Sequence, residues 1–346
     1  MPSAAEPIRA AIAEAGGAIS FERFMALALY GEGGFYSDAG GIAGCRGDFI
    51  TSPEIGPLFG ALIARWLDAA WVELDQPDPF TFVDAGAGPG TLARSIRLAQ
   101  PSCLQALRYI AVEVSSGQRE RHPDWVVSVA EMPTEPFVGA ILANELLDNL
   151  PFRLFVMDGG WREAFVVAQA NGTFGEVLRP ASDLAQLDLP ASAPHGSRVP
   201  VQQVAAHWVG SALDLLQRGR VLAIDYGVAM TSELAARPWR DWLRTYAGHQ
   251  RGQHYLRDPG TQDITCDVVT EQLDRQAATQ FTTTTQAEFV RSLGIGVLVS
   301  EGRRIWAEQA ATPTMLALRM RSRISESEAL LDPQGLGDFT VLEWNR

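Results

Sequence analysis

The stretch Val83-Asp84-Ala85-Gly86-Ala87-Gly88-Pro89-Gly90 decides the fold of this chain of 346 residues. It begins at the end of a short apolar run, Thr81-Phe82-Val83, and leads into a stretch of helical spacing over 91–100. Glycines in such a turn let a ligand approach the backbone without a Cβ in the way, and the next helix offers free N–H groups to a polar or anionic ligand. This order of strand, turn and helix predicts an α/β fold with a doubly wound, Rossmann-like sheet.

Short apolar runs alternate with helical stretches after this turn, as in a series of βαβ units. The further strands are expected at 109–112, 125–129, 139–143, 220–224 and 339–342. The further helices are expected to begin near Ser115 and to span 201–216, 286–293 and 314–324. We therefore expect one core domain over residues 80–346.

An N-terminal helical segment, residues 1–79, is expected to precede this core. Apolar residues at helical spacing predict one helix over 3–30, with Ser20 as an imperfect N-cap, and another over 53–71. The glycine-rich stretch 31–47 between them predicts a loop.

Two insertions are expected within the core. Turn signals at Asp158-Gly159-Gly160 and Asn171-Gly172 predict a small antiparallel sheet over about 152–198. Residues 228–280 are polar and irregular, so we expect them to form a substrate lid over the site.

Composition indicates a soluble globular protein and excludes several classes of function. Hydrophobic residues make up 47% of the chain and the net charge is −13, which argues against broad binding to nucleic acid or to an anionic membrane. No apolar run reaches the roughly 18 residues that a membrane span needs. The first 19 residues have the pattern of neither a secretory signal nor a transit peptide. A cytoplasmic location is expected, or the mitochondrial matrix if the owner is eukaryotic.

The three cysteines and five histidines are scattered along the chain. None of them has the spacing of a zinc site or of a disulfide framework. No metal is therefore expected.

The glycine turn differs from two common phosphate-binding turns. A dinucleotide fingerprint needs a third glycine where this chain has Thr91, and a P-loop needs a lysine that the chain lacks. The pattern that remains is G-x-G-x-G, for which a plain tight turn is the alternative interpretation.

Polar residues at the ends of the following strands indicate S-adenosylmethionine (AdoMet) as the ligand. Ligands of open α/β sheets bind beyond these carboxyl ends, and Glu113 stands where a carboxylate accepts bonds from both ribose hydroxyls. A solvated strand end is the alternative role of Glu113. The expected cofactor-binding residues are Asp84, Gly86, Gly88, Gly90, Glu113, Val114, Glu131, Met132 and Asn144, with Asp48 and Thr51 from the N-terminal segment.

Several blocks match one family pattern over nearly the whole length. The most distinctive is Gly47-Asp48-Phe49-Ile50-Thr51-Ser52-Pro53-Glu54, with Leu58-Phe59-Gly60 after it and Gly33-Gly34-Phe35-Tyr36 before it. Ala143-Asn144-Glu145-Leu146-Leu147-Asp148-Asn149-Leu150-Pro151 follows A-N-E-x-x-D-A-L-P, with Asn149 in place of alanine. Ile224-Asp225-Tyr226-Gly227 and the stretches 243–249 and 258–265 follow later blocks. Together they resemble the MidA-like methyltransferase family.

The resemblance implies an enzyme that uses AdoMet. The family's mitochondrial members assist the assembly of respiratory complex I, and their activity is symmetric dimethylation of a protein arginine, so a protein substrate is expected. Three departures from the pattern stand out: Asp84 replaces a usual glutamate, Asp241-Trp242 replaces Gly-Thr, and Asp267 replaces a histidine. The last two lie in the expected lid and leave the substrate open.

Three carboxylates are the expected catalytic residues. A guanidinium has no acceptor, so an arginine methyltransferase needs carboxylates that hold its N–H groups and aim one nitrogen at the methyl group. Glu145 and Asp148 are three residues apart, where a helical turn would place them on one face, and Glu54 is the third candidate. Asp48 is expected to close over the site with Glu54. Helix capping is the alternative role of Glu145 and Asp148, and an Asx turn that of Asp48.

The substrate side leaves more alternatives open. Tyr226, Tyr246 and His249 are candidates for a substrate channel, with ordinary packing as the alternative. The function that we expect is methylation of a protein arginine. A methyltransferase of a small molecule or of another O or N nucleophile is one alternative, and a non-catalytic assembly or scaffold protein is another. The oligomeric state is open, with a homodimer among the options.

Overall fold

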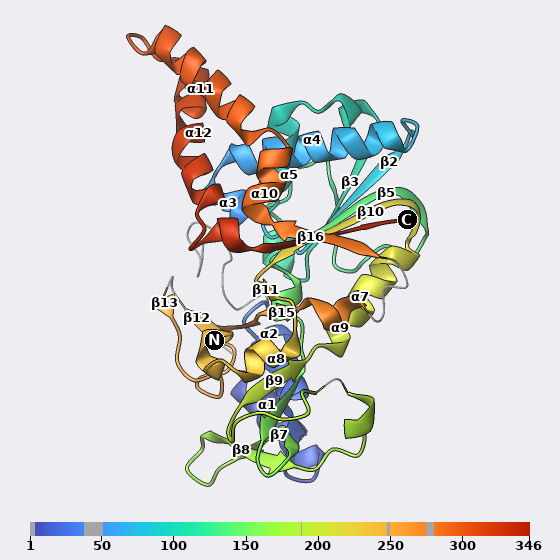
Figure 1. Cartoon of the computed structure of the whole chain (residues 1–346), viewed down its shortest axis with the longest axis vertical. Helices are drawn as coiled ribbons and strands as arrows, with labels where there is room; N and C mark the ends of the chain where they lie inside the picture. The colour runs from blue at the N-terminus through green and yellow to red at the C-terminus, as the bar shows by residue number, and fades with distance from the viewer. Residues whose placement is uncertain (1–3, 38–50, 188, 248–249, 275–279) are drawn as a thin grey trace.

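The computed structural model describes residues 4–37, 51–187, 189–247, 250–274 and 280–346. The molecule has two parts, one above the other along its longest axis (Figure 1). The upper part holds the core sheet and its helices, and the lower part holds smaller antiparallel sheets and the first two helices.

The core sheet has seven strands in the order β16-β17-β10-β5-β2-β3-β4. Its strands are β2 (Phe80–Ala85), β3 (Leu107–Val112), β4 (Val127–Val129), β5 (Phe137–Asn144), β10 (Leu216–Asp225), β16 (Phe281–Thr285) and β17 (Thr340–Asn345). The strands from β10 to β4 are parallel, whereas β16 and β17 are antiparallel. The predicted α/β fold with a doubly wound sheet is confirmed.

Helices cover both faces of this sheet because neighbouring strand residues point to opposite sides. Phe82 packs in the cluster with α4 (Pro57–Glu73), α5 (Thr91–Ala99) and α10 (Gln286–Ser292). Val83 packs in the opposite cluster with α7 (Gln203–Asp214) and Leu273 of α9 (Thr270–Asp274). Helix α6 (Ser116–Arg119) follows β3.

The two long N-terminal helices that we expected are each divided. The stretch 3–30 forms α1 (Ala5–Glu14) and α2 (Phe21–Tyr30), separated by Gly16 and Gly17 and the short strand β1 (Ile19–Ser20). Both glycines have positive φ, which ends a right-handed helix. Gly56, with φ of 154°, likewise separates α3 (Ser52–Ile55) from α4. The N-cap at Ser20 is confirmed, since its side chain accepts a bond from the backbone N–H of Arg23.

The lower part is built around a five-stranded antiparallel sheet. It holds β1 with β6 (Arg153–Met157), β7 (Trp161–Ala168), β8 (Phe174–Arg179) and β9 (Arg198–Val201). Helices α1 and α2 pack against this sheet, whereas α4 packs on the core sheet. The first 79 residues therefore contribute to both parts of the molecule.

The expectation that residues 228–280 are irregular is wrong. They include α8 (Thr231–Ala235), α9, and the strands β12 (Leu243–Ala247), β13 (Gln250–Arg251), β14 (Asp263–Cys266) and β15 (Val268–Val269), the last paired with β11 (Gly227–Val228). Trp242, Tyr255 and Ile264 are buried in the cluster that holds Phe21. Tertiary burial therefore orders a stretch whose local composition resembles a loop.

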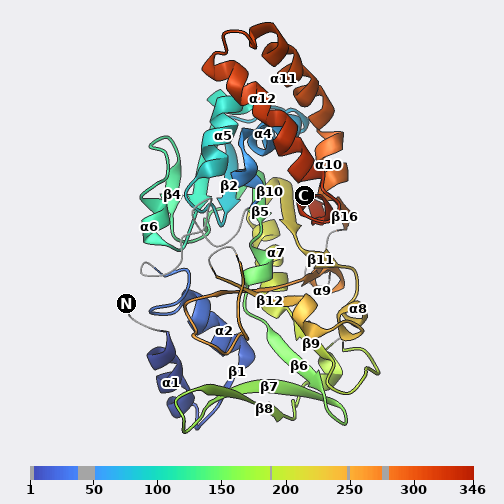
Figure 2. The ribbon, with the colours of Figure 1, turned by 90° about the vertical axis from the view of Figure 1, so that its left-hand side faces the viewer.

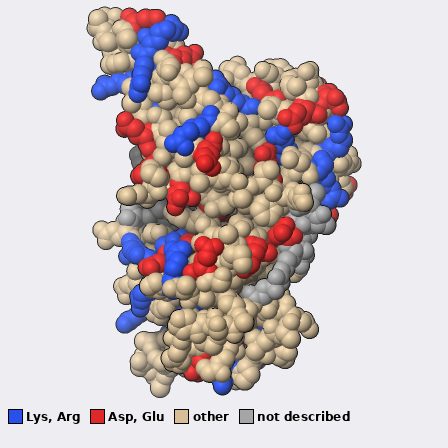
Figure 3. All heavy atoms as spheres, in the orientation of Figure 1, with Lys and Arg blue, Asp and Glu red and all other residues tan. Residues whose placement is uncertain are grey.

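The C-terminal region holds two elements that the sequence analysis missed, β16 and α11 (Ile295–Gln309). Strand β16 reads Phe-Thr-Thr-Thr-Thr, so Phe281 is its one apolar residue, and it pairs at the edge of the sheet. Helix α11 packs against α12 (Met315–Leu331), and the two project from the body as a hairpin (Figures 1 and 2). Basic side chains gather on this hairpin (Figure 3).

In the part of the chain that the structure describes, no helix has the length and apolar character that spanning a membrane would require.

Candidate cofactor and active site

A cavity of about 320 Å³ lies where the predicted cofactor turn meets the carboxyl ends of β2, β3 and β5. Eleven predicted site residues line it: Thr51, Glu54, Asp84, Gly86, Gly88, Glu113, Val114, Glu131, Met132, Asn144 and Glu145. Gly90 and Asp148 are not among the lining residues. Asp48 lies outside the described residues.

The glycine turn has the backbone conformation for which glycine is suited. Gly86, Gly88 and Gly90 have φ of 75°, 53° and 76°, in the left-handed region that other residues seldom adopt. The N–H of Gly86 donates to the carbonyl of Val112 (3.0 Å) and ties the turn to the neighbouring strand. Gly90 is the N-cap of α5, so its contribution is to begin the helix rather than to line the cavity.

Glu113 joins the turn to the end of β3. Its Oε2 accepts a bond from the N–H of Gly88 (3.0 Å) and its Oε1 from the N–H of Ser115 (2.9 Å). Each carboxylate oxygen can accept more than one hydrogen bond, so both stay able to accept from a ligand hydroxyl. The geometry therefore fits the expected contact with a ribose.

Two buried acceptors at the cavity fit the donor groups of AdoMet. Among the described residues, Asn144 Oδ1 and Gln118 Oε1 have no hydrogen-bond partner, and both residues line the cavity. A buried acceptor without a donor is costly, so such atoms indicate a ligand or water that donates to them. AdoMet carries such donors on its amino-acid, ribose and adenine parts.

Asp84 lines the cavity, and its carboxylate also links two strands of the core sheet. Its Oδ2 accepts a bond from the Tyr109 hydroxyl (2.6 Å) inside the core. Burial raises the pKa of Asp84 to about 7, although the bond from Tyr109 acts against this shift. The side chain thus anchors β2 to β3 beside the turn.

Glu145 stands in the cavity wall with a strained backbone. Its φ is 52°, in a region that costs a residue with a side chain on the order of 1–3 kcal/mol and is found at functional sites. Its Oε1 accepts bonds from the N–H of Ser52 (3.2 Å) and from Asn144 Nδ2 (3.0 Å). Burial first, and then the charge of Asp148, raise the pKa of Glu145 to about 8.

Glu54 reaches the same cavity from α3. Burial raises the pKa of its carboxyl above the ordinary value. Two carboxyl groups from segments 91 positions apart therefore share one cavity.

Asp148 does not share a helical face with Glu145, and this geometric expectation is wrong. The left-handed backbone of Glu145 breaks any regular turn, and only Leu147–Asn149 form a short 3-10 helix. Asp148 is 3% exposed, and its N–H donates to Asp225 Oδ2 (3.2 Å). Burial, with the neighbouring charge of Asp225 next, raises the pKa of Asp148 well above its usual range.

The expected lid does not line the cavity. Tyr226 is absent from the lining, as are Tyr246 and the other described residues of 228–280, and His249 lies outside the described residues. Tyr226 instead packs against Phe339, with their ring centres 4.2 Å apart. Packing is thus the role that the structure gives Tyr226.

Sequence reasoning missed two tyrosines of the cavity wall. Tyr30 and Tyr36 stack with ring centres 5.6 Å apart and an interplanar angle of 19°. Their hydroxyls donate to the backbone oxygen of Asn149 (3.1 Å) and to its Oδ1 (3.3 Å). Tyr36 and Asn149 both lie in the blocks that resemble the family pattern, and this resemblance was the sequence signal that could have marked them as site residues. Leu146, which lies in the same block as Asn149, also lines the cavity. Gln118 and Trp208 line it too, and no sequence signal marked them.

The comparisons with known proteins agree with AdoMet as the cofactor. A family described as “Putative S-adenosyl-L-methionine-dependent methyltransferase” matches residues 62–288. The mitochondrial protein arginine methyltransferase NDUFAF7 homolog of Drosophila melanogaster is 27% identical over 305 residues, covering 77% of this chain and 68% of its own. The mouse protein arginine methyltransferase NDUFAF7, also mitochondrial, is 27% identical over 341 residues, covering 85% and 73%.

A solved structure resembles nearly the whole chain. It is the crystal structure of a Burkholderia thailandensis protein bound to S-adenosylhomocysteine. The TM-score is 0.83 at 28% identity, and the match covers 99% of this chain and 92% of that one.

Proposed function

Since the chain belongs to the family of S-adenosyl-L-methionine-dependent methyltransferases, we propose that it methylates an arginine side chain of a protein. AdoMet is its cofactor and supplies the electrophilic methyl group. The observation that carries the arginine proposal is the pair of carboxyl groups, Glu145 and Glu54, in the wall of the cofactor cavity.

Glu145 suits both demands of this acceptor. A guanidinium is positively charged and offers N–H groups in a rigid fork, which a carboxylate binds through charge-assisted bonds. Methyl transfer to it releases a proton, and the ionised form of Glu145, which becomes the major form above a pH of about 8, can accept that proton. The acceptor nitrogen would then be aimed by Glu145, with Glu54 as the second carboxyl group.

The stacked tyrosines support a cationic acceptor. Tyr30 and Tyr36 line the cavity together with both glutamates. An aromatic face attracts a guanidinium by about 0.5–2 kcal/mol. The names of the mitochondrial relatives, which are protein arginine methyltransferases, support the same acceptor.

The test is labelling of a cell lysate of the source organism with AdoMet that carries a tritiated methyl group. We expect label in protein, released as methylarginine on acid hydrolysis, and none above background with a Glu145→Gln variant. Label only in small molecules would contradict the protein acceptor. Failure of calorimetry to detect binding at millimolar AdoMet would favour a scaffold protein instead. A homodimer stays a prediction, which light scattering on the purified protein tests.

A further inference from the structure

Helix α3 carries active-site groups but is only four residues long. Ser52, at its start, donates its N–H to Glu145 and its hydroxyl to Gln286 Oε1 (2.9 Å), and Glu54 lines the cavity. An isolated helix of this length is unstable, so its position must come from tertiary contacts.

Glu326 of α12 supplies such a contact from the C-terminal hairpin. Its side chain is buried, with the residue 4% exposed, and its Oε2 accepts a bond from the N–H of Leu58 (2.8 Å). The Ser322 hydroxyl donates to its Oε1. Leu58 lies in the first turn of α4, where backbone N–H groups lack helical partners and favour a negative charge.

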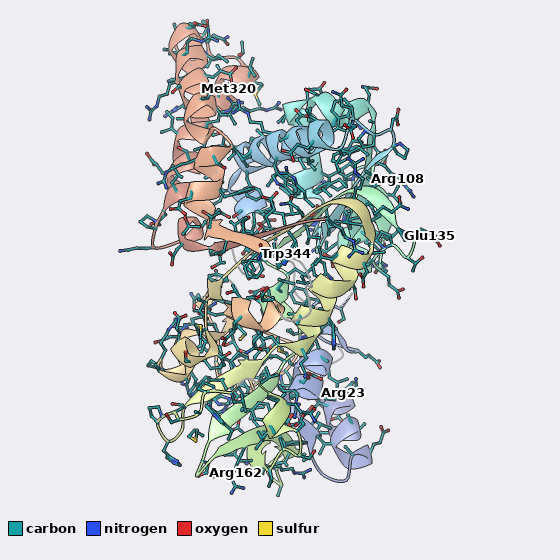
Figure 4. The ribbon with its side chains drawn as sticks, turned by 45° about the vertical axis from the view of Figure 1, so that its right-hand side comes forward. Arg23, Arg108, Glu135, Arg162, Met320 and Trp344 are labelled. Carbon is teal, nitrogen blue, oxygen red and sulfur yellow. The ribbon has the colours of Figure 1, made fainter. Side chains whose placement is uncertain are left out.

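The same carboxylate packs against the turn between α3 and α4. A Cβ at Gly56 would lie 2.3 Å from Glu326 Cδ and 2.6 and 2.7 Å from its two oxygens, so a side chain there would displace the carboxylate. Helix α12 also contacts both α3 and α4 along this junction. Its other end reaches into the projecting hairpin, where Met320 is labelled in Figure 4.

We propose that Glu326 is a positioning residue for methyl transfer, which fixes the Gly56 turn and thereby holds Ser52 on Glu145 and Glu54 in the cavity wall. Glu326 is not a lining residue of the cavity, so it acts through α3. This inference rests on the proposed role of Glu145.

The bond from Ser52 makes the inference measurable. That N–H stabilises the charged form of Glu145 and lowers its pKa, against the opposing effects of burial and nearby carboxylates. Four titratable groups interact with Glu145 through their charges. They are Glu54 from α3, Asp148 from the 3-10 helix, Asp225 at the end of β10 and Tyr226 directly after it. If α3 shifts, Glu145 loses its donor from Ser52, and this loss raises its pKa by more than removal of the smaller effect of the Glu54 charge lowers it.

The experiment compares Glu326→Ala with Glu328→Ala, an exposed glutamate of the same helix. Two readouts need no methyl acceptor: hydrogen exchange of residues 52–58 in the protein without cofactor, and a ¹³C NMR titration of Glu145, assigned with Glu145→Gln. In Glu326→Ala we expect exchange to rise about tenfold or more and the Glu145 midpoint to move up. Glu328→Ala should change neither, and both variants should bind S-adenosylhomocysteine within about threefold of the parent.

Activity gives the third readout. Label transfer to protein should fall about tenfold in Glu326→Ala, with its pH midpoint raised. Faster exchange with an unchanged Glu145 midpoint and transfer rate would overturn the positioning role.

If Glu326→Ala does not fold, Glu326→Gln is the second variant. It keeps an acceptor for Leu58 but loses the charge, and it should show the same changes to a smaller degree. A Glu326→Gln variant identical to the parent in exchange and midpoint would also overturn it. Absence of methylarginine with the parent protein would contradict the arginine proposal and leave the first two readouts intact.

Discussion

The cofactor turn and the buried aspartate cluster, defined as Asp148, Asp225, Asp263 and Asp267, differ in how the chain builds them. The turn lies within one strand-turn-helix unit, and its partner Glu113 ends the adjacent strand. The four aspartates come from segments up to 119 positions apart and are each at most 5% exposed. The first region follows from local sequence, and the second exists only after folding.

The cluster shows what burial does to charge. Arg244 pairs with Asp267 (Nη1 to Oδ1, 2.7 Å) and lies over the Tyr226 ring at 4.5 Å. Arg237 gives Asp267 a second, more exposed partner at 3.3 Å. Isolated buried carboxylates resist ionisation, and burial raises the pKa of both Asp148 and Asp225 well above their usual range.

Glu145 lies between these two regions, and this position explains its chemistry. It faces the cofactor cavity, yet the charge of Asp148 contributes to its raised pKa. We infer that the cluster tunes Glu145 while the turn holds the cofactor, and four experiments test this division.

The largest effect is expected from Glu145→Gln. Loss of the base should lower the rate of methyl transfer by about 10²–10⁴, whereas AdoMet affinity should change less than about threefold. In the parent protein the rate should rise with pH to a plateau above about 8, because the ionised form of Glu145 is the proposed base. Single-turnover kinetics with labelled AdoMet and the labelled protein acceptor measure both.

Asp148→Asn is the matched comparison for Glu145→Gln. Since Asp148 lies outside the cavity lining, its variant should retain a transfer rate well above that of Glu145→Gln. A loss as large as that of Glu145→Gln, in a folded protein, would place Asp148 in the chemistry and remove the distinction between the two regions.

The second effect concerns the turn. Glu113→Gln puts an amide group against the N–H groups of Gly88 and Ser115, and it should weaken AdoMet binding by about 10- to 100-fold, as expected for lost bonds to a charged group. Calorimetry measures this change. Glu135→Gln, at an exposed position outside the cavity lining, is the control, for which we expect less than about a threefold change. Equal losses in both variants would argue against a special role of Glu113.

The third effect concerns the cluster and is a dependence of stability on pH. The pKa of Asp225 is raised in the folded protein, so the unfolded chain releases this proton first as the pH rises. The free energy of unfolding should therefore fall between the ordinary aspartate pKa and the raised one, by up to about 1.4 kcal/mol per pH unit for each such group.

The free energy of unfolding should fall less steeply with pH in Asp225→Asn than in the parent protein. Asp124→Asn, at an exposed position, should keep the slope of the parent. Urea unfolding at pH values from 5 to 9 gives the slopes for the three proteins. A parent protein whose stability rises over this range would contradict raised pKa values in the cluster.

The smallest effect is expected from Gly88→Ala. A Cβ at Gly88 meets no atom within 4 Å, so the cost comes only from placing alanine at φ of 53°, about 1–2 kcal/mol. Gly296→Ala in α11 also meets no atom, but its backbone is helical, and it should stabilise the protein by about 0.5–1 kcal/mol. Opposite signs in urea unfolding would confirm that the conformation of the turn requires glycine.

Local patterns predicted most of the core sheet and the cofactor side of the site. The strand before Gly86, the helix after Gly90 and the acidic end of β3 each have a short-range signal. Strand β16 lacked a short-range signal of this kind, because four threonines stand where apolar residues are usual. The helix expected over 3–30 was divided because Gly16 and Gly17 take positive φ, which composition alone did not indicate.

The amino-acid sequence was enough to predict the doubly wound sheet and the glycine turn at Gly86, Gly88 and Gly90. Each βα unit of the sheet has its own short-range signal, and the turn depends on the steric freedom of glycine. Only the tertiary structure decided which carboxylates face the cavity. Glu145 and Asp148 are three residues apart, yet the left-handed backbone at Glu145 places the first in the cavity wall and the second among buried aspartates. Burial and neighbouring charge set the pKa of each group, and both are products of contacts between distant segments.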